Sequence, residues 1–94
     1  MMSGCEELLK QIAEMFNCKV WVCEKVGRRI SHIPNLKAGR ERFVPPIVAF
    51  EDENYVVFVE ADGLNEELRK LCERVVECVR CVRKDRSTSR TSDA

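Results

Sequence analysis

Apolar residues recur at helical spacing near both ends of the chain. One set begins at Cys5 and ends at Phe16, and a second set with the same spacings begins 63 positions later, at Leu68. At about 100° per residue, each set forms one broad stripe along a helix. Short amphipathic helices are marginal alone and need a shared apolar surface, which the middle of the chain must supply. The two sets are Cys5, Leu8, Leu9, Ile12, Ala13, Met15 and Phe16, and Leu68, Leu71, Cys72, Val75, Val76, Cys78 and Val79.

The middle of the chain has the composition of β-strands separated by turns. Its apolar runs are rich in valine, isoleucine and aromatic residues, and Gly27 favours a turn between two of them. Residues 34–46 contain three prolines and Gly39, so we expect a loop there. Asn17 is the predicted end of the first helix, and Asn65 is the predicted N-cap of the last helix. The predicted strands span residues 18–26, 29–33, 47–50 and 55–60, with the second ended by Pro34, and the last helix ends near Arg83.

The order α-β-β-β-β-α predicts a single α+β domain at residues 1–84. In this domain, a four-stranded antiparallel sheet carries the N- and C-terminal helices packed on one face. Residues 85–94 have no apolar side chain before Ala94, and we expect them to form a disordered polar tail. A chain of 94 residues has enough core to fold but little surplus stability.

The predicted strands are apolar on both faces. A strand with one face in water should alternate between apolar and polar residues, but residues 20–23, 47–50 and 55–59 do not. Two helices can cover only one face of the sheet. The 34–46 loop, a second copy of the chain or a bound ligand must therefore cover the other face. We expect a homodimer or a partner protein, with the candidate interface residues Trp21, Phe58, Leu71, Val76, Cys78 and Cys81.

Charge is balanced overall but unevenly distributed. The chain has 16 basic and 16 acidic side chains. The tail from Arg80 onward is basic, and the segment 28–42 holds five basic residues against Glu41 alone. Arginine and lysine there could bind a small anionic ligand, with a solvated loop as the simpler interpretation. The acidic stretch over residues 51–77 would repel phosphates, so we do not expect nucleic-acid binding. The candidate ligand-binding residues are His32, Lys37, Arg40 and Arg42.

No sequence feature indicates export or a membrane span. No apolar run approaches the roughly 20 residues needed to cross a bilayer, and the N-terminus lacks a secretory signal pattern. We therefore expect a cytoplasmic protein. In that compartment the six cysteines favour reduced thiols, with a disulfide as the alternative.

The pair Cys78–Cys81 is the motif with the most chemical promise. It lies near the C-terminus of the predicted helix, where the helix dipole opposes a thiolate. The chain has no second cysteine pair at the spacing of a zinc site. We therefore expect no metal and no cofactor. Cys81 projects from the polar side of the helix, where it is exposed and could join two chains.

The sequence does not indicate an enzyme. His32 is the single histidine, and its neighbour Ser31 points to the opposite face of a strand, which is poor geometry for a nucleophile and its base. Neither a Gly-x-Ser-x-Gly motif nor a glycine-rich phosphate loop occurs.

Five segments between about residues 5 and 83 carry a resemblance to known domains. They are Leu8-Leu9-x-x-Ile12-Ala13, Val20-Trp21-Val22, Pro46-Ile47-Val48, Tyr55 to Val59 and Asn65-Glu66-Glu67-Leu68-x-x-Leu71. In these segments the chain resembles GAF domains and, more loosely, their PAS and roadblock relatives, which are sensor or scaffold modules with a central antiparallel sheet and flanking helices. GAF domains are usually longer, and roadblock domains usually carry a helix between the second and third strands that the prolines here disfavour.

This resemblance and the doubly apolar sheet together predict a non-enzymatic regulatory or protein-interaction module that dimerises. The alternative is a small-molecule sensor, in which the basic segment 28–42 holds an anionic ligand.

Overall fold

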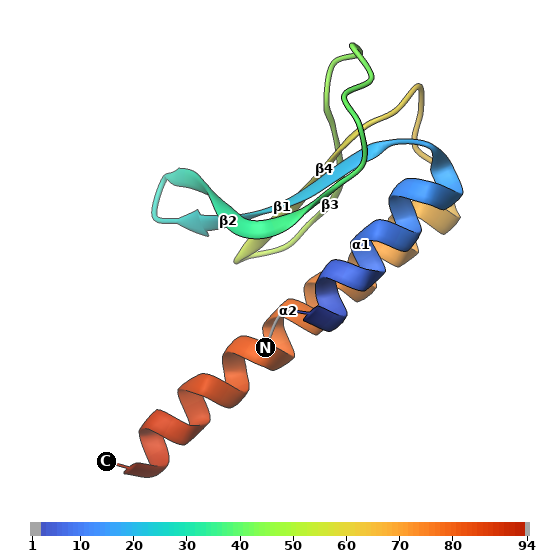
Figure 1. The fold of residues 1–94 in the computed structure, drawn as a ribbon. Helices are drawn as coiled ribbons and strands as arrows, with labels where there is room; N and C mark the ends of the chain where they lie inside the picture. Colours follow the sequence, from blue (N-terminus) through green and yellow to red (C-terminus); the bar gives the residue numbers. More distant parts are fainter. Residues whose placement is uncertain (1–2, 94) are drawn as a thin grey trace.

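The protein folds into two helices on a four-stranded sheet (Figure 1). The computed structural model describes the backbone of residues 3–93 and the side chains of residues 4–33 and 35–82. The predicted α+β class and the order α-β-β-β-β-α are confirmed. The elements are α1 (Ser3–Phe16), β1 (Lys19–Val26), β2 (Arg29–Ala38), β3 (Ile47–Glu51), β4 (Tyr55–Glu60) and α2 (Glu66–Asp93).

The strands form two hairpins that meet at the centre of the sheet. The order across the sheet is β2-β1-β4-β3, and every neighbouring pair is antiparallel. The central pair, β1 and β4, joins segments from the two halves of the chain. Both helices lie on the same side of the sheet, with α1 beside α2 (Figure 1). The predicted packing of both helices on one face is therefore confirmed.

The ends of the helices follow the local sequence. Asn17 adopts a left-handed φ of 49°, and the Cys18 amide donates to the Ala13 carbonyl at 3.2 Å, which ends α1. At the start of α2, Oδ1 of Asn65 accepts a hydrogen bond from the Leu68 amide at 2.7 Å. Asn65 is therefore the N-cap, as the sequence predicts.

Strand β2 corrects the prediction that Pro34 ends the second strand. The strand continues to Ala38, because β2 is an edge strand, where a missing N–H need not break the ladder. Its register against β1 shifts between the pairs Cys23–His32 and Trp21–Lys37, and Asn35 within this bulge has a φ of 70°. The loop predicted over residues 34–46 is correspondingly shorter and begins at Gly39.

Helix α2 also extends beyond its predicted end near Arg83. It runs to Asp93, because the residues after Arg83 include neither proline nor glycine to stop it. Disorder of the polar tail at residues 85–94 in solution stays a prediction, and Ala94 lies outside the described residues.

The core lies between the helices and the inner face of the sheet, which is the face turned toward them. On β4, for example, Val57 and Val59 contribute to it, and both are fully buried. The bulge in β2 directs Leu36 into the same core, also fully buried. The other fully buried members of this core include Leu9, Ile12, Val20, Cys72, Val75 and Val79.

Candidate functional site

The face of the sheet turned away from the helices, here called the outer face, is the candidate site. Side chains alternate along each strand, and directly paired residues share a face. Val57 and Val59 point toward the helices, so Val56 and Phe58 point outward. The register then gives two rows across the outer face, in the order β2-β1-β4-β3. They are Lys37-Trp21-Phe58-Val48 and His32-Cys23-Val56-Glu51.

An aromatic pair forms the centre of the outer face. The rings of Trp21 and Phe58 stack with centroids 5.7 Å apart and an interplanar angle of 21°. Nζ of Lys19 lies 5.5 Å from the centroid of the Trp21 ring, within cation–π range. Cys23 and Val56 are short and lie between larger neighbours, so each is only 1% exposed.

Apolar side chains surround this pair, and no described helix covers them. Val48 is 45% exposed, and Ile30 at the other edge of the sheet is 54% exposed. An open cavity of about 320 Å³ is lined by Trp21, Cys23, Ile30, His32, Pro46 and Phe58. The segment after β2 borders the face through Pro46, which lines this cavity, but Phe43 at its middle is 94% exposed and does not pack on the face. The outer face is therefore apolar at its centre, charged or polar at several positions toward its edges, and not covered by a described helix.

Charge is divided between the two halves of the sheet. The β1–β2 hairpin has five basic side chains (Lys19, Lys25, Arg28, Arg29 and Lys37) against Glu24 alone. The β3–β4 hairpin has four acidic side chains (Glu51, Asp52, Glu53 and Glu60) and no basic one. On the outer face itself, the register places Lys19, Lys25 and Lys37 on the β1–β2 half and Glu51 and Glu60 on the β3–β4 half. Lys25 and Glu51 form an ion pair within the chain, and Asp52 pairs with Arg80 of α2.

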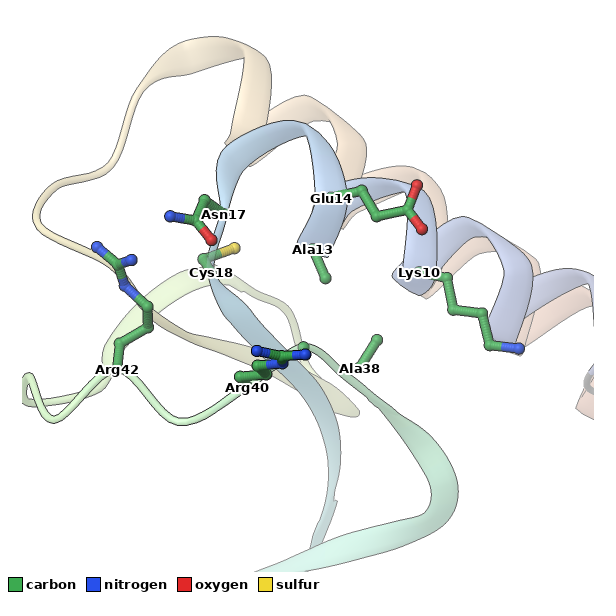
Figure 2. Close-up of a pocket in the computed structure, with 9 residues that line it drawn as sticks. Lys10, Ala13, Glu14, Asn17, Cys18, Ala38, Arg40 and Arg42 are labelled. Carbon is green, nitrogen blue, oxygen red and sulfur yellow. The ribbon is translucent and has the colours of Figure 1, made fainter.

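The structure divides the four predicted ligand-binding residues between two cavities. His32 and Lys37 lie on the outer face and line a cavity of about 340 Å³ with Trp21 and Glu60. Arg40 and Arg42 instead line a cavity of about 480 Å³ between the end of α1 and the segment after β2 (Figure 2). The four residues therefore do not form a single site.

The second cavity combines basic and polar groups. Lys10, Glu14, Asn17 and Cys18 line it together with the two arginines, as Figure 2 shows. Nη2 of Arg42 lies 3.7 Å from Oδ2 of Asp62. Nε of Arg42 is buried without a hydrogen-bond partner, which is seen for no other buried side-chain nitrogen or oxygen within residues 4–33 and 35–82. A buried donor of this kind is costly unless something accepts its hydrogen bond.

Among the described residues, Cys23 and His32 are the pair that most resembles a nucleophile and its base. The thiol sulfur of Cys23 lies 3.8 Å from Nδ1 of His32. Burial raises the pKa of the Cys23 thiol, with a smaller opposing effect from Trp21. A thiol that is both buried and harder to ionise is a poor nucleophile at neutral pH.

All six cysteines lie within the described residues, and all are free thiols. Burial raises the pKa of Cys5 to about 12, and a hydrogen bond with Cys78 contributes further. Burial likewise raises the pKa of Cys72 to about 12, with nearby Cys18 adding to the shift. Four of the six thiols are buried, whereas Cys78 is half-buried and Cys81 is exposed, as predicted. Most of these cysteines therefore act as small apolar core residues.

Because the pKa of Cys72 is raised, the stability of the protein should decrease as the pH rises above about 9. The folded-state pKa of Cys72 is raised, so above about pH 9 the unfolded chain loses this proton while the folded chain keeps it. Its contribution to stability is therefore complete below pH 9 and decreases by about 1.4 kcal/mol per pH unit as the pH rises toward 12. Urea unfolding at pH 8, 9 and 10 should show a shallower decline for Cys72→Ala than for the unmodified chain. Equal slopes would contradict the assignment.

The predicted interface residues on α2 are not equally available. Val76 is 1% exposed and packs into the core of its own chain. The prediction that its side chain lies at an interface is therefore wrong. Leu71 and Cys78 are half-buried against the same core, and Cys81 is exposed. The helical stripe predicted burial of Val76, but only the tertiary packing shows how completely it is covered.

Sequence reasoning missed other members of the outer face, including Lys19, Ile30, Val48 and Glu60. Which face each occupies depends on the register between strands, which the sequence pattern does not specify. The one sequence feature that hinted at the charged members of this face was the difference in charge between the β1–β2 and β3–β4 hairpins.

The described residues show no further chemistry of a recognised kind. No cluster of three or more histidine, cysteine or acidic residues that could hold a metal ion occurs among them. Within the same residues, no helix combines the length and apolar character needed to pass through a bilayer. Comparisons with models of protein families, with curated proteins and with solved structures found no match.

Proposed function

We propose that this protein is a non-enzymatic regulatory or protein-interaction module that dimerises through the outer face of its sheet. The observation that carries the proposal is the stacked Trp21–Phe58 pair at the centre of an apolar face that no described helix covers. Large aromatic side chains with apolar neighbours and a charged border are typical of the residues that dominate binding energy in interfaces.

Sedimentation velocity at micromolar concentration tests this proposal. We expect the unmodified protein to sediment as a dimer and Trp21→Ser to raise the dissociation constant by at least about 30-fold, because loss of a central aromatic typically costs 2 kcal/mol or more. Phe43→Ser is the matched control. It also removes an aromatic ring, but from a side chain 94% exposed outside the sheet, and it should leave the dissociation constant unchanged. A clean monomer of the unmodified protein would contradict the proposal.

The regulatory character and the GAF-like relationship stay predictions, as does a cytoplasmic location. They rest on the arrangement of elements and on sequence pattern. A sheet flanked by helices is a fold that hosts many functions, so the interaction surface carries the proposal and the fold does not.

A second candidate function, binding of a small anion, is favoured by the buried Nε of Arg42. The cavity beside it is large enough for a small phosphorylated or carboxylated molecule and is lined by Lys10, Arg40 and Arg42. Arginine is well suited to bind such groups with two parallel hydrogen bonds. Glu14 in the same lining opposes an anion, which places this candidate second.

A thermal-shift titration with inorganic pyrophosphate tests anion binding. At about 100 times its dissociation constant, a ligand adds roughly 2.7 kcal/mol to stability and raises the melting temperature visibly in a domain of this size. The shift should disappear in Arg40→Gln and persist in Arg69→Gln, an exposed arginine on α2 that does not line the cavity. No shift with pyrophosphate or citrate would remove this candidate.

A further inference from the structure

We infer that the partner on the outer face is a second copy of this chain, related by a two-fold axis that runs parallel to the strands between β1 and β4. The inference rests on the proposed function and specifies the partner and its orientation. It starts from the division of charge described above, in which the β1–β2 half of the sheet is basic and the β3–β4 half is acidic. A surface divided in this way is complementary to a rotated copy of itself.

The orientation of the axis follows from the strand order. Rotation about an axis parallel to the strands exchanges the two halves, so the basic β1–β2 half of one copy covers the acidic β3–β4 half of the other. Rotation about an axis that runs across the strands would instead place each half over the same half of the second copy. That arrangement opposes like charges, which is costly at an interface. The charge pattern therefore selects the first arrangement.

The register then predicts which residues face each other across the interface. Trp21 lies over Phe58 of the second copy, and Phe58 over its Trp21, so the two aromatic pairs form one central cluster. In the same rows, Lys37 lies over Val48 of the second copy, and His32 over its Glu51. At one end of the strands, Lys19 pairs with Glu60 of its own chain and, in this arrangement, also lies over Glu60 of the second copy.

Geometry permits this packing. Two sheets that pack face to face keep their strands within about 30° of each other and lie roughly 10 Å apart. Lysine and glutamate at the border are long enough to meet across that distance. Because the two copies use the same surface, the assembly closes as a dimer and does not extend into a filament.

Charge-reversed variants test whether the partner is a second copy. Lys19→Glu makes the Lys19–Glu60 contact acidic on both sides, and Glu60→Lys makes it basic on both sides. We expect each variant alone to dimerise at least about 10-fold more weakly, and an equimolar mixture of the two to form a heterodimer. The chain that carries both changes should dimerise like the unmodified protein. Lys70→Glu and Glu73→Lys, exposed on α2 in the other layer, are the matched controls and should change nothing.

Two further readouts accompany the mixing experiment. Circular dichroism melts of each variant establish that a weaker dimer does not come from unfolding. Raising the salt concentration from 0.05 to 0.5 M, which shortens the Debye length from about 14 to about 4 Å, should weaken the unmodified dimer several-fold. A dimer unaffected both by charge reversal and by salt would overturn the inference.

Site-directed cross-linking tests the orientation. Position 37 on β2 and position 48 on β3 lie at opposite edges of one sheet, about 14 Å apart at three strand spacings. Across the inferred interface, position 37 faces position 48 of the second copy. In a Cys81→Ser background, a mixture of Lys37→Cys and Val48→Cys chains treated with a short bis-maleimide should give a covalent dimer on a denaturing gel. Each variant alone should give little.

The outcomes separate this inference from the proposed function. Cross-linking of Lys37→Cys to a His32→Cys chain, in place of Val48→Cys, would indicate an axis across the strands. It would overturn the inferred orientation but leave the dimer intact. A dimer that persists in Trp21→Ser would place the interface elsewhere and overturn both. A protein that is monomeric by sedimentation would do the same.

Discussion

Gly39→Ala is expected to destabilise the fold by about 3 to 5 kcal/mol, the largest effect of any single substitution proposed here. Gly39 follows β2 with a φ of +95°, a conformation that residues with a Cβ rarely adopt. A Cβ at this position would overlap the carbonyl oxygen of Cys18 and lie 2.9 Å from Cα of Lys19. Both are backbone atoms at the junction of α1 and β1, so neither can move aside as a flexible side chain could.

Gly27→Ala is the matched control for this prediction. Gly27 lies in the β1–β2 turn with a φ of +63°, and a Cβ there would meet no atom within 4 Å. This substitution adds backbone strain without a clash and should cost about 1 to 2 kcal/mol. Urea unfolding of both variants measures the difference. Equal losses would show that the approach of β2 to the Cys18 carbonyl is not close in solution.

Leu9→Ala is expected to cost about 3 kcal/mol, within the range of 2 to 5 kcal/mol for buried leucines. Leu9 is fully buried where α1 meets the sheet and α2, so truncation removes apolar contact and leaves a cavity. A domain of this size has a total stability of about 5 to 15 kcal/mol, so the loss is a large fraction of it.

Leu64→Ala makes the same chemical change at a side chain that is 43% exposed. It should change stability by less than about 0.5 kcal/mol. Thermal unfolding should therefore show a melting temperature at least 10 °C lower for Leu9→Ala than for Leu64→Ala, at about 4 to 8 °C per kcal/mol. Similar melting temperatures would mean that α1 does not contribute to the cooperative core.

Local sequence signals predicted most of the secondary structure. Asn17 ends α1 and Asn65 caps α2, because both effects depend only on the residue and its neighbours along the chain. The end of β2 was wrong because Pro34 disrupts a central strand but not an edge strand, and the position of a strand within the sheet is a tertiary property.

The candidate site was predicted only in part. Three predicted strands have apolar residues at both odd and even positions, which indicated an open apolar face. The stacked Trp21–Phe58 pair lies at the centre of this face. The predicted anion-binding residues separated into two cavities because the bulge around Asn35 and the turn at Gly39 direct Lys37 and Arg40 to different places. No pattern in the sequence specifies those backbone angles.

The sequence by itself determined the two amphipathic helices, the strands between them and the existence of a second apolar face, because periodicity and capping act over a few residues. Only the tertiary structure decided that β1 and β4 lie together at the centre and that opposite charges lie on opposite halves of one surface. Those features depend on the pairing of segments more than 30 residues apart, such as Trp21 with Phe58, and such pairing is selected by the packing of the whole core.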